Sequence, residues 1–373
     1  MVLNLTKRLI GAFENYKGYL PRLEIVDNGL LEVDPHLAKC FEENMFPSYY
    51  DQATGIDDII IKRSTLIACF SECYKYLYQV PNPSKDDLYF ATLGILLVSA
   101  EDHTALNLNW EILQNSPEKM HSTFKVITLY LTCSISKTNK SASLWLYYRK
   151  LLIRFISEDP KCQKNLIKQI LDVIILSIKI HKRSYYAGYT LRFMIALLRM
   201  TNNNDLIQYY LNKIFHYVRT DGLNDMSMWQ IWAQLLLEFD DEKYYRLSII
   251  KLGYPSTSHV YKLSPITVLN CYHQLMEWLL SLGYKFYPGW FVAALLARDT
   301  GNATKMKNYL ETEIANFEKI GNSRAYVKQF TFSDSQHRKD DNTDIIKEEL
   351  SDKYMTLKKL YYTFYISDAL YKE

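Results

Sequence analysis

The chain has 373 residues, enough for one long helical array or for two domains of ordinary size. Glycine and proline are few, 12 and 10 residues, and this scarcity argues against a β-sandwich or an α/β enzyme, which need more turn residues. Hydrophobic residues make up 48% of the chain, so an extended core is possible. No uncharged apolar run reaches about 18 residues, so we predict no transmembrane segment.

The net charge of +3 hides a strong asymmetry along the chain. Residues 23–121 carry 6 basic and 16 acidic side chains, a net charge of −10. Residues 137–199 carry 13 basic and 3 acidic side chains, a net charge of +10. A basic block of this size indicates either a polyanionic partner, such as nucleic acid, or an acidic protein surface. It also occurs as a solvated outer face, and that alternative stays open.

The N-terminal segment, residues 1–22, is basic, poor in acids and amphipathic, with Leu5, Leu9 and Phe13 on one face of a helix. These properties are typical of a mitochondrial presequence, but they also fit the first helix of the fold. Six scattered cysteines without framework spacing indicate reduced thiols in an intracellular protein. We predict a mitochondrial location, with an intracellular location in the cytoplasm or nucleus as the alternative.

Apolar residues spaced three or four apart, together with capping and turn residues, predict helices along almost the whole chain. In chain order we expect them at residues 35–45, 56–80, 87–100, 105–114, 122–136, 142–156, 160–179, 185–200, 205–218, 226–239, 242–252, 265–282, 288–298, 303–320 and 345–371. No useful length of strand-like alternation is visible. The predicted fold is therefore all-α, an irregular α-solenoid of antiparallel helical hairpins that ends in a long C-terminal helix.

The same pattern divides the chain into successive regions. We expect an acidic N-terminal helical region at 23–136, a helical-hairpin repeat region at 137–331 that contains the basic block 137–199, a polar mobile linker at 332–344 and a C-terminal helix at 345–373. Leu350, Tyr354, Leu357, Tyr361 and Phe364 would form an apolar seam along that last helix. The seam either caps the helical array or receives a protein partner.

The clearest hairpin occupies residues 283–320. Pro288 opens its first helix, Gly301-Asn302 forms the turn, and Met306, Leu310 and Phe317 lie on one stripe of the second helix. This segment resembles a pentatricopeptide or tetratricopeptide repeat, although the loop at 253–262 is longer than a regular repeat allows. The pentatricopeptide resemblance implies binding of single-stranded RNA, mostly in organelles, and the tetratricopeptide resemblance implies protein partners. The register is not fixed, so no base-reading position is carried over.

The basic block supplies the candidate site. Cationic side chains recur at helical spacing and are followed by tyrosines that can stack on unpaired bases. The candidate phosphate contacts are Arg149, Lys150, Arg154, Lys164, Lys168, Lys182 and Arg183, and the candidate stacking residues are Tyr186 and Tyr189.

Motifs for other chemistry are missing from the sequence. There is no phosphate-binding glycine loop and no H-E-x-x-H zinc motif. Cys69 and Cys73 lie one helical turn apart and either share a metal with a distant histidine or pack in the core; we expect the core. We predict no catalytic residue, no metal and no cofactor. The leading hypothesis is a non-enzymatic, RNA-binding helical-repeat protein of mitochondrial gene expression, acting in mRNA stability, processing or translation. The alternative is a protein–protein scaffold or assembly factor.

Overall fold

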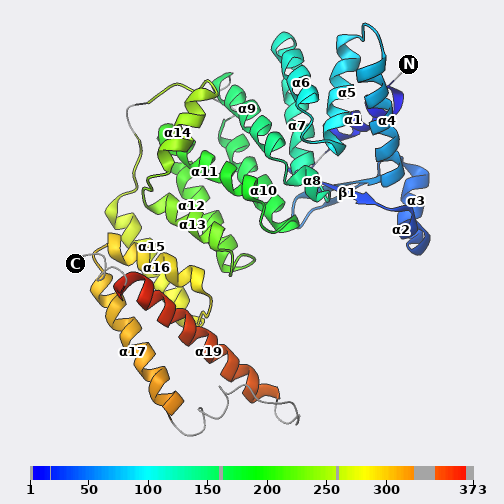
Figure 1. Ribbon diagram of the computed structural model, residues 1–373. Helices are drawn as coiled ribbons and strands as arrows, with labels where there is room; N and C mark the ends of the chain where they lie inside the picture. Colours follow the sequence, from blue (N-terminus) through cyan, green and yellow to red (C-terminus); the bar gives the residue numbers. More distant parts are fainter. Residues whose placement is uncertain (1–2, 17, 159–162, 258–259, 323–340, 367–373) are drawn as a thin grey trace. The chain divides into compact units, whose positions relative to one another are not determined.

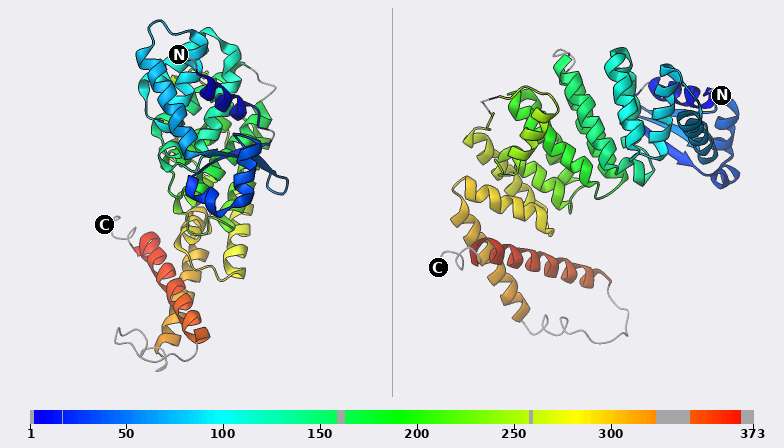
Figure 2. Two further views of the ribbon diagram at one scale, coloured as in Figure 1. Left: turned by 90° about the vertical axis from the view of Figure 1, so that its right-hand side faces the viewer. Right: turned by 45° about the horizontal axis from the view of Figure 1, so that its top comes forward.

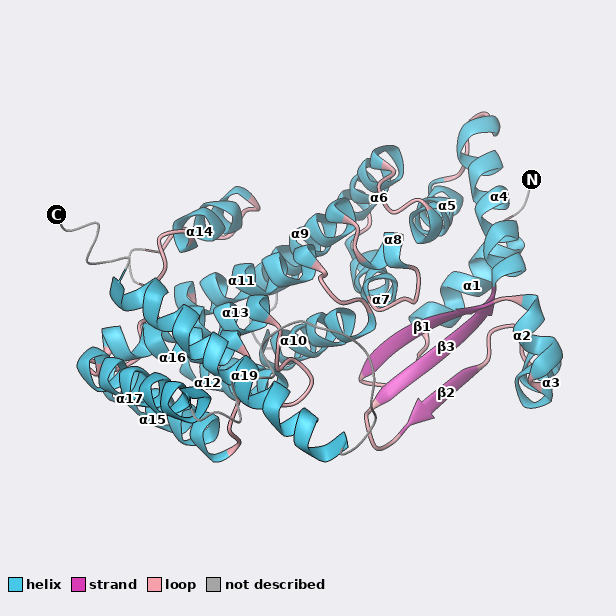
Figure 3. Cartoon of the chain, turned by 60° about the horizontal axis from the view of Figure 1, so that its bottom comes forward, coloured by secondary structure: helices cyan, strands magenta, loops and turns pink. Residues whose placement is uncertain are grey.

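A computed structural model describes residues 3–16, 18–158, 163–257, 260–322 and 341–366. The described chain is mostly helical (Figure 1), which confirms the coarse prediction of fold class. It is not purely helical, because a small β-sheet lies in its N-terminal part (Figure 3). Contacts divide the chain into two compact units, residues 1–197 with 243–258 (the N-terminal unit) and residues 198–242 with 259–373 (the C-terminal unit).

The sheet has three strands in the order β1-β3-β2, with β1 at Leu20–Val26, β2 at Ser48–Asp51 and β3 at Ile56–Lys62. β1 runs parallel to β3 and β2 runs antiparallel to it. The prediction of a helix over 56–80 was therefore wrong for its first seven residues, and the helix α4 begins only at Arg63 and ends at Gln79. The expectation that no strand would form was wrong at all three strands.

Strand β3 has the alternation expected of a half-buried strand, with Asp57, Ile59 and Ile61 buried in turn. The alternation of apolar and polar residues is incomplete in the sequence, because the first of the three inward positions is the acidic Asp57. The Oδ2 atom of Asp57 accepts a hydrogen bond of 2.9 Å from the backbone N–H of Gly18, which satisfies the buried carboxylate. A close tertiary contact thus permits a residue that a hydrophobicity pattern counts against a strand.

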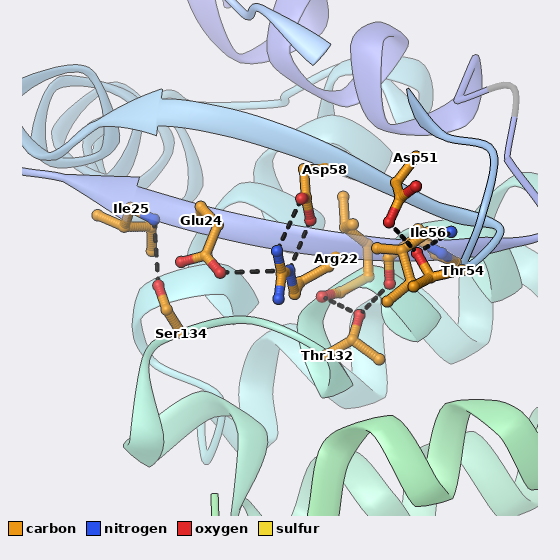
Figure 4. A network of polar contacts seen from close by, with 11 residues as sticks. Arg22, Glu24, Ile25, Asp51, Thr54, Ile56, Asp58, Thr132 and Ser134 are labelled. Carbon is orange, nitrogen blue, oxygen red and sulfur yellow. Dashed lines mark hydrogen bonds and ion pairs between the residues drawn. The ribbon is translucent and has the colours of Figure 1, made fainter. Parts of the chain in front are cut away.

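A polar network fastens β1 to its neighbours (Figure 4). Arg22 donates to both carboxylate oxygens of Asp58 on β3, at 2.5 and 2.7 Å, and lies 3.3 Å from Glu24. Such a two-point guanidinium–carboxylate contact fixes direction as well as distance. On the other side of β1, the hydroxyl of Ser134 accepts a 3.1 Å bond from the N–H of Ile25. The strand is therefore held at both of its edges.

The first helix, α1 (Asn4–Glu14), is part of the core of the N-terminal unit. Leu9, Ile10 and Phe13 are completely buried, and both the N–H and the hydroxyl of Thr6 donate to the carboxylate of Glu72 on α4. Of the two hypotheses for residues 1–22, this packing favours the first helix of the fold over a detachable presequence, because removing the helix would uncover apolar surface.

The remaining elements of the predicted acidic region, 23–136, are short to medium helices around the sheet. They are α2 (Asn28–Val33), α3 (Pro35–Glu43), α5 (Lys85–Val98), α6 (His103–Asn115), the 3₁₀ turn η1 (Pro117–Lys119), α7 (Met120–Leu131) and α8 (Ser136–Asn139). Ser84 caps α5 by accepting from the N–H of Asp87. α4 packs on α5 and α5 packs on α6, so consecutive helices are neighbours in space (Figure 2).

The predicted hairpin region contains the helices α9 (Ala142–Glu158), α10 (Gln163–Ile180), α11 (Tyr185–Met200), α12 (Asn204–Arg219), α13 (Met226–Leu236), α14 (Glu242–Lys251), α15 (Pro265–Ser281), α16 (Tyr287–Asp299) and α17 (Ala303–Asn322). The last pair matches the hairpin predicted from Pro288 and Gly301-Asn302. Gly301 adopts a positive φ of 72° at the turn, a conformation that favours glycine. Met306 and Leu310 are buried as the apolar stripe requires.

The C-terminal helix α19 begins at Asp341, ends at Tyr361 and continues as a π-helical turn, η2 (Tyr362–Ile366). Of the predicted mobile linker 332–344, residues 332–340 lie outside the described residues, and the rest already belong to α19. Leu357 and Phe364 of the predicted seam are buried, and so is the neighbouring Leu360, where α19 packs on α16 and α17. This part of the predicted apolar seam covers the end of the helical array.

Candidate nucleic-acid interface

A row of lysines follows one face of α10. At 100° per residue, Lys168 and Lys179 lie within about 60° of Lys164 around the helix, over about 22 Å. Lys182 follows in the turn after Ile180, where α10 ends. Lys164, Lys179 and Lys182 are exposed, and Lys168 is half-buried. Asp172, also half-buried, lies about 80° from Lys164 and borders the row. We call these four lysines the basic stripe.

The turn between α10 and α11 extends the basic stripe and adds aromatic rings. Arg183 is exposed and has a positive φ of 63°, and Lys140 donates to the backbone oxygen of Lys182 at 3.0 Å, which anchors the turn. Tyr185 and Tyr186, at the start of α11, are 76% and 44% exposed. Cations and accessible rings thus lie next to one another at this end of α10, as binding of an unpaired strand requires.

Helix α9 places its two outer candidates differently. Arg154 is exposed. The ammonium of Lys150 lies 3.7 Å from the centre of the Trp110 ring, and burial lowers the pKa of this lysine. Lys150 is half-buried and already engaged with an aromatic face, so it is a weaker candidate for a phosphate contact than Arg154.

Arg149 does not lie on the surface, and the prediction that it contacts phosphate was wrong. Its side chain is 6% exposed, donates to the hydroxyl of Thr190 at 2.9 Å, and lies 4.7 Å from the ring centre of Tyr189. Burial lowers its pKa to about 10. Arg149 contributes to the interior contact between α9 and α11, because its position on α9 points inward.

Tyr189 is also less available than its position in the sequence suggested. It is half-buried, and its ring packs against Tyr245 at 4.8 Å between centres while it receives the Arg149 guanidinium. A ring held between two side chains has little face left for a base. Tyr186 keeps its place as a stacking candidate, and the more exposed Tyr185 joins it.

Apart from Lys150, five of the predicted cations are exposed or half-buried, and three of them belong to the basic stripe. These five cations are Arg154, Lys164, Lys168, Lys182 and Arg183, and the predicted ring that stays exposed is Tyr186. Lys179 and Tyr185 were not among the predicted residues, although the spacing of Lys179 from Lys164 placed it on the same helical face. We call these five predicted cations, together with Lys179, Tyr185 and Tyr186, the basic surface.

Other parts of the described chain show different chemistry. Cys69 and Cys73 are buried on α4, Cys73 lies 3.1 Å from the hydroxyl of Thr6, and burial raises the pKa of both thiols to about 12. Such thiols stay protonated and are poor nucleophiles at neutral pH. Within the described ranges, no helix is long and apolar enough to cross a membrane.

Comparison with known proteins relates the chain to ECM9. Residues 3–132 match the ECM9 N-terminal domain, and residues 144–251 match the ECM9 middle domain, which includes most of the basic block. The chain is 26% identical over 210 residues to Protein ECM9 of Saccharomyces cerevisiae (strain ATCC 204508 / S288c), and the alignment covers 53% of each protein. The chain thus spans about half the length of this relative. In two successive segments, which together hold 238 of its 373 residues, the chain is similar to the ECM9 domains.

Proposed function

We propose that the chain is a non-enzymatic protein that binds single-stranded RNA through the basic surface of α10 and its neighbours. The observation that carries the proposal is the basic stripe, in which three lysines share one face of α10 and a fourth follows in the turn after it. A row of cations attracts a phosphate backbone without reading its sequence. Tyr185 and Tyr186 add exposed rings at one end of the row, which favours an unpaired strand over a duplex.

The proposal includes a role in mitochondrial gene expression, in mRNA stability, processing or translation. This part rests on the resemblance of residues 283–320 to organellar repeat proteins, because the burial of α1 removes the support that a presequence-like N-terminal segment would give. Because α1 packs into the core, it stays attached to the fold in this proposal. The finer architecture, a solenoid of helical hairpins, is supported by the contacts between consecutive helices such as α15, α16 and α17.

The alternative is a protein–protein scaffold or assembly factor. Part of the predicted seam of α19 is occupied internally, because Leu357 and Phe364 are buried. A partner would therefore take another face of that helix, where Met355 and Tyr362 are exposed. An acidic partner on the basic surface is a second form of this alternative.

Charge reversal tests the RNA proposal. The triple variant Arg154→Glu, Lys164→Glu and Lys182→Glu changes three exposed cations, one on α9, one on α10 and one in the turn after it. We expect RNA affinity to fall at least tenfold at low salt, and the log–log salt slope to become shallower by about 2, because each lost contact removes about 0.7. Fluorescence anisotropy with a labelled A/U-rich RNA measures both quantities.

The matched control makes the same change in charge elsewhere in the N-terminal unit. Lys39→Glu, Lys75→Glu and Lys85→Glu reverse three exposed lysines of the acidic region. Both triple variants should melt within a few degrees of the wild type, because exposed substitutions have small effects. Equal loss of RNA affinity in the two variants would indicate a response to net charge alone and would refute a defined site.

A further inference from the structure

A groove lies in the C-terminal unit, between the segment that opens α16 and the outer face of α19. Lys285, Phe286 and Tyr287 line one side, and Met355, Lys359 and Tyr362 line the other. Its volume is about 670 Å³. This falls within the roughly 300–1,000 Å³ of sites that bind small molecules. None of these residues belongs to the basic surface, which lies in the N-terminal unit.

The two sides of the groove are fastened to each other. The hydroxyl of Thr356 on α19 donates to the backbone oxygen of Lys285 at 2.8 Å, and the ammonium of Lys359 lies 4.7 Å from the ring centre of Tyr287. On the far side of α19, Leu357 and Leu360 are fully buried. The groove is thus a preformed feature with fixed walls.

Positive charge gathers at the groove. Lys285, Lys358 and Lys359 line it together with one acid, Asp352, which leaves an excess of two positive charges. Lys358 is held by the hydroxyl of Tyr354 at 2.8 Å and lies 3.6 Å from Glu318, and the bond to Tyr354 is the main reason that its pKa is raised. Cations at the rim of a largely apolar recess favour a ligand with an anionic end.

The body of the groove suits a flat, apolar ligand. Tyr362 is 51% exposed and Met355 is 60% exposed, both on the groove side of α19, and the partly exposed rings of Phe286 and Tyr287 face them across it. Aromatic faces hold nucleobases by stacking, and methionine adapts its shape to flat partners.

The geometry points to a nucleotide site in this groove: the base lies among Phe286, Met355 and Tyr362, and the phosphate lies against Lys285 and Lys359. The shared chemistry is an aromatic base that carries a phosphate. It has two sources, a free nucleotide or an unpaired nucleotide of an RNA strand. The inference stands on the groove alone and does not require the basic surface to bind RNA.

The experiment measures binding of uridine monophosphate, uridine, inorganic phosphate and a ten-residue A/U RNA to the full chain by calorimetry. The charge variant is Lys285→Gln with Lys359→Gln, and the stacking variant is Tyr362→Ala. The control variant, Lys305→Gln with Lys319→Gln, removes two exposed lysines from α17 in the same unit. Because RNA is also expected to bind the basic surface, each RNA titration is repeated in the triple variant Arg154→Glu, Lys164→Glu and Lys182→Glu.

We expect uridine monophosphate to bind at least tenfold more tightly than uridine or phosphate alone. The charge variant should lower this affinity at least tenfold, and Tyr362→Ala should lower it roughly 5- to 150-fold, the range seen for lost base stacking. The control variant should bind as the wild type does. If RNA binds more tightly than the mononucleotide and responds to the same variants, the source is a strand; if only the mononucleotide responds, the source is a free nucleotide.

The proposed site is overturned if neither nucleotide nor RNA binding responds to the groove variants, or if a polyglutamate peptide binds there and uridine monophosphate does not. The latter result would assign the groove to an acidic protein partner. A negative result for the groove would not affect the proposal for the basic surface, because that proposal is tested with variants of the N-terminal unit. Conversely, loss of RNA binding in the triple variant with retained mononucleotide binding would confirm that the groove acts on its own.

Discussion

Replacing Arg199 by alanine is expected to lower the free energy of unfolding by about 3–5 kcal/mol, the range for breaking one side of a buried ion pair. Arg199 is 3% exposed, and its guanidinium pairs with the carboxylate of Glu242, which is 7% exposed. The same guanidinium donates to the backbone oxygens of Gln234, Leu235 and Leu237 at 3.0–3.3 Å. These carbonyls end α13, where a helix leaves its acceptors without partners.

Three further variants separate the contributions of donor geometry, buried charge and ion pairing to this loss of stability. Arg199→Lys keeps the charge but not the fork of donors, so we expect an intermediate loss. The double variant Arg199→Met with Glu242→Leu should lose less than Arg199→Ala, because it leaves no buried charge without its partner. Lys262→Ala breaks the exposed pair with Glu238 in the same unit and should cost at most about 1 kcal/mol. Urea unfolding followed by circular dichroism measures each value; a loss from Arg199→Ala as small as that from Lys262→Ala would contradict the assigned role.

Replacing Trp145 by alanine is expected to cost a similar amount, about 3–5 kcal/mol. Trp145 lies on α9 and is completely buried, with its ring edge-on to Tyr148 at 5.9 Å. Its indole N–H donates to the backbone oxygen of Asn139 at 2.7 Å. The Asn139 amide in turn donates to the backbone oxygen of Leu131 and to the hydroxyl of Ser177. The substitution would open a cavity and leave a buried carbonyl unsatisfied.

The controls for this prediction come from the same helix. Trp145→Phe keeps much of the packing but loses the donor, so about 1–3 kcal/mol should be lost. Leu146→Ala changes the next residue, which is exposed, and should alter stability by at most about 0.5 kcal/mol. If Trp145→Ala and Leu146→Ala have the same midpoint of urea unfolding, α9 is not packed as described.

The helices could be predicted from the sequence because their signals are local. Ser84 caps α5, Pro288 lies in the first turn of α16, and the turn at Gly301-Asn302 separates α16 from α17, each within a few residues of the feature it controls. The sheet could not be predicted in this way. The parallel pairing of Leu23 with Ile59 joins segments 36 residues apart, and the buried Asp57 needs the N–H of Gly18 to make its position acceptable.

The candidate site could likewise be predicted from the sequence only in part. The excess of positive charge and the shared face of Lys164 and Lys168 follow from composition and helical spacing alone. The burial of Arg149 does not, because it depends on Thr190 and Tyr189 of another helix. The groove of the C-terminal unit had no sequence signal at all, since Lys285 and Lys359 meet only when α19 folds back on the start of α16.

The most direct test of the central claim is a salt titration of binding to a fluorescent, A/U-rich single-stranded RNA, with duplex DNA as the control. Six phosphate contacts, from Arg154, Lys164, Lys168, Lys179, Lys182 and Arg183, predict a log–log slope of about −4.2, since each contact to a single strand contributes about −0.7. We expect binding that prefers the single strand at every salt concentration. No binding at low salt, or equal binding to the duplex, would contradict the RNA-binding account and leave the basic surface as a site for an acidic protein.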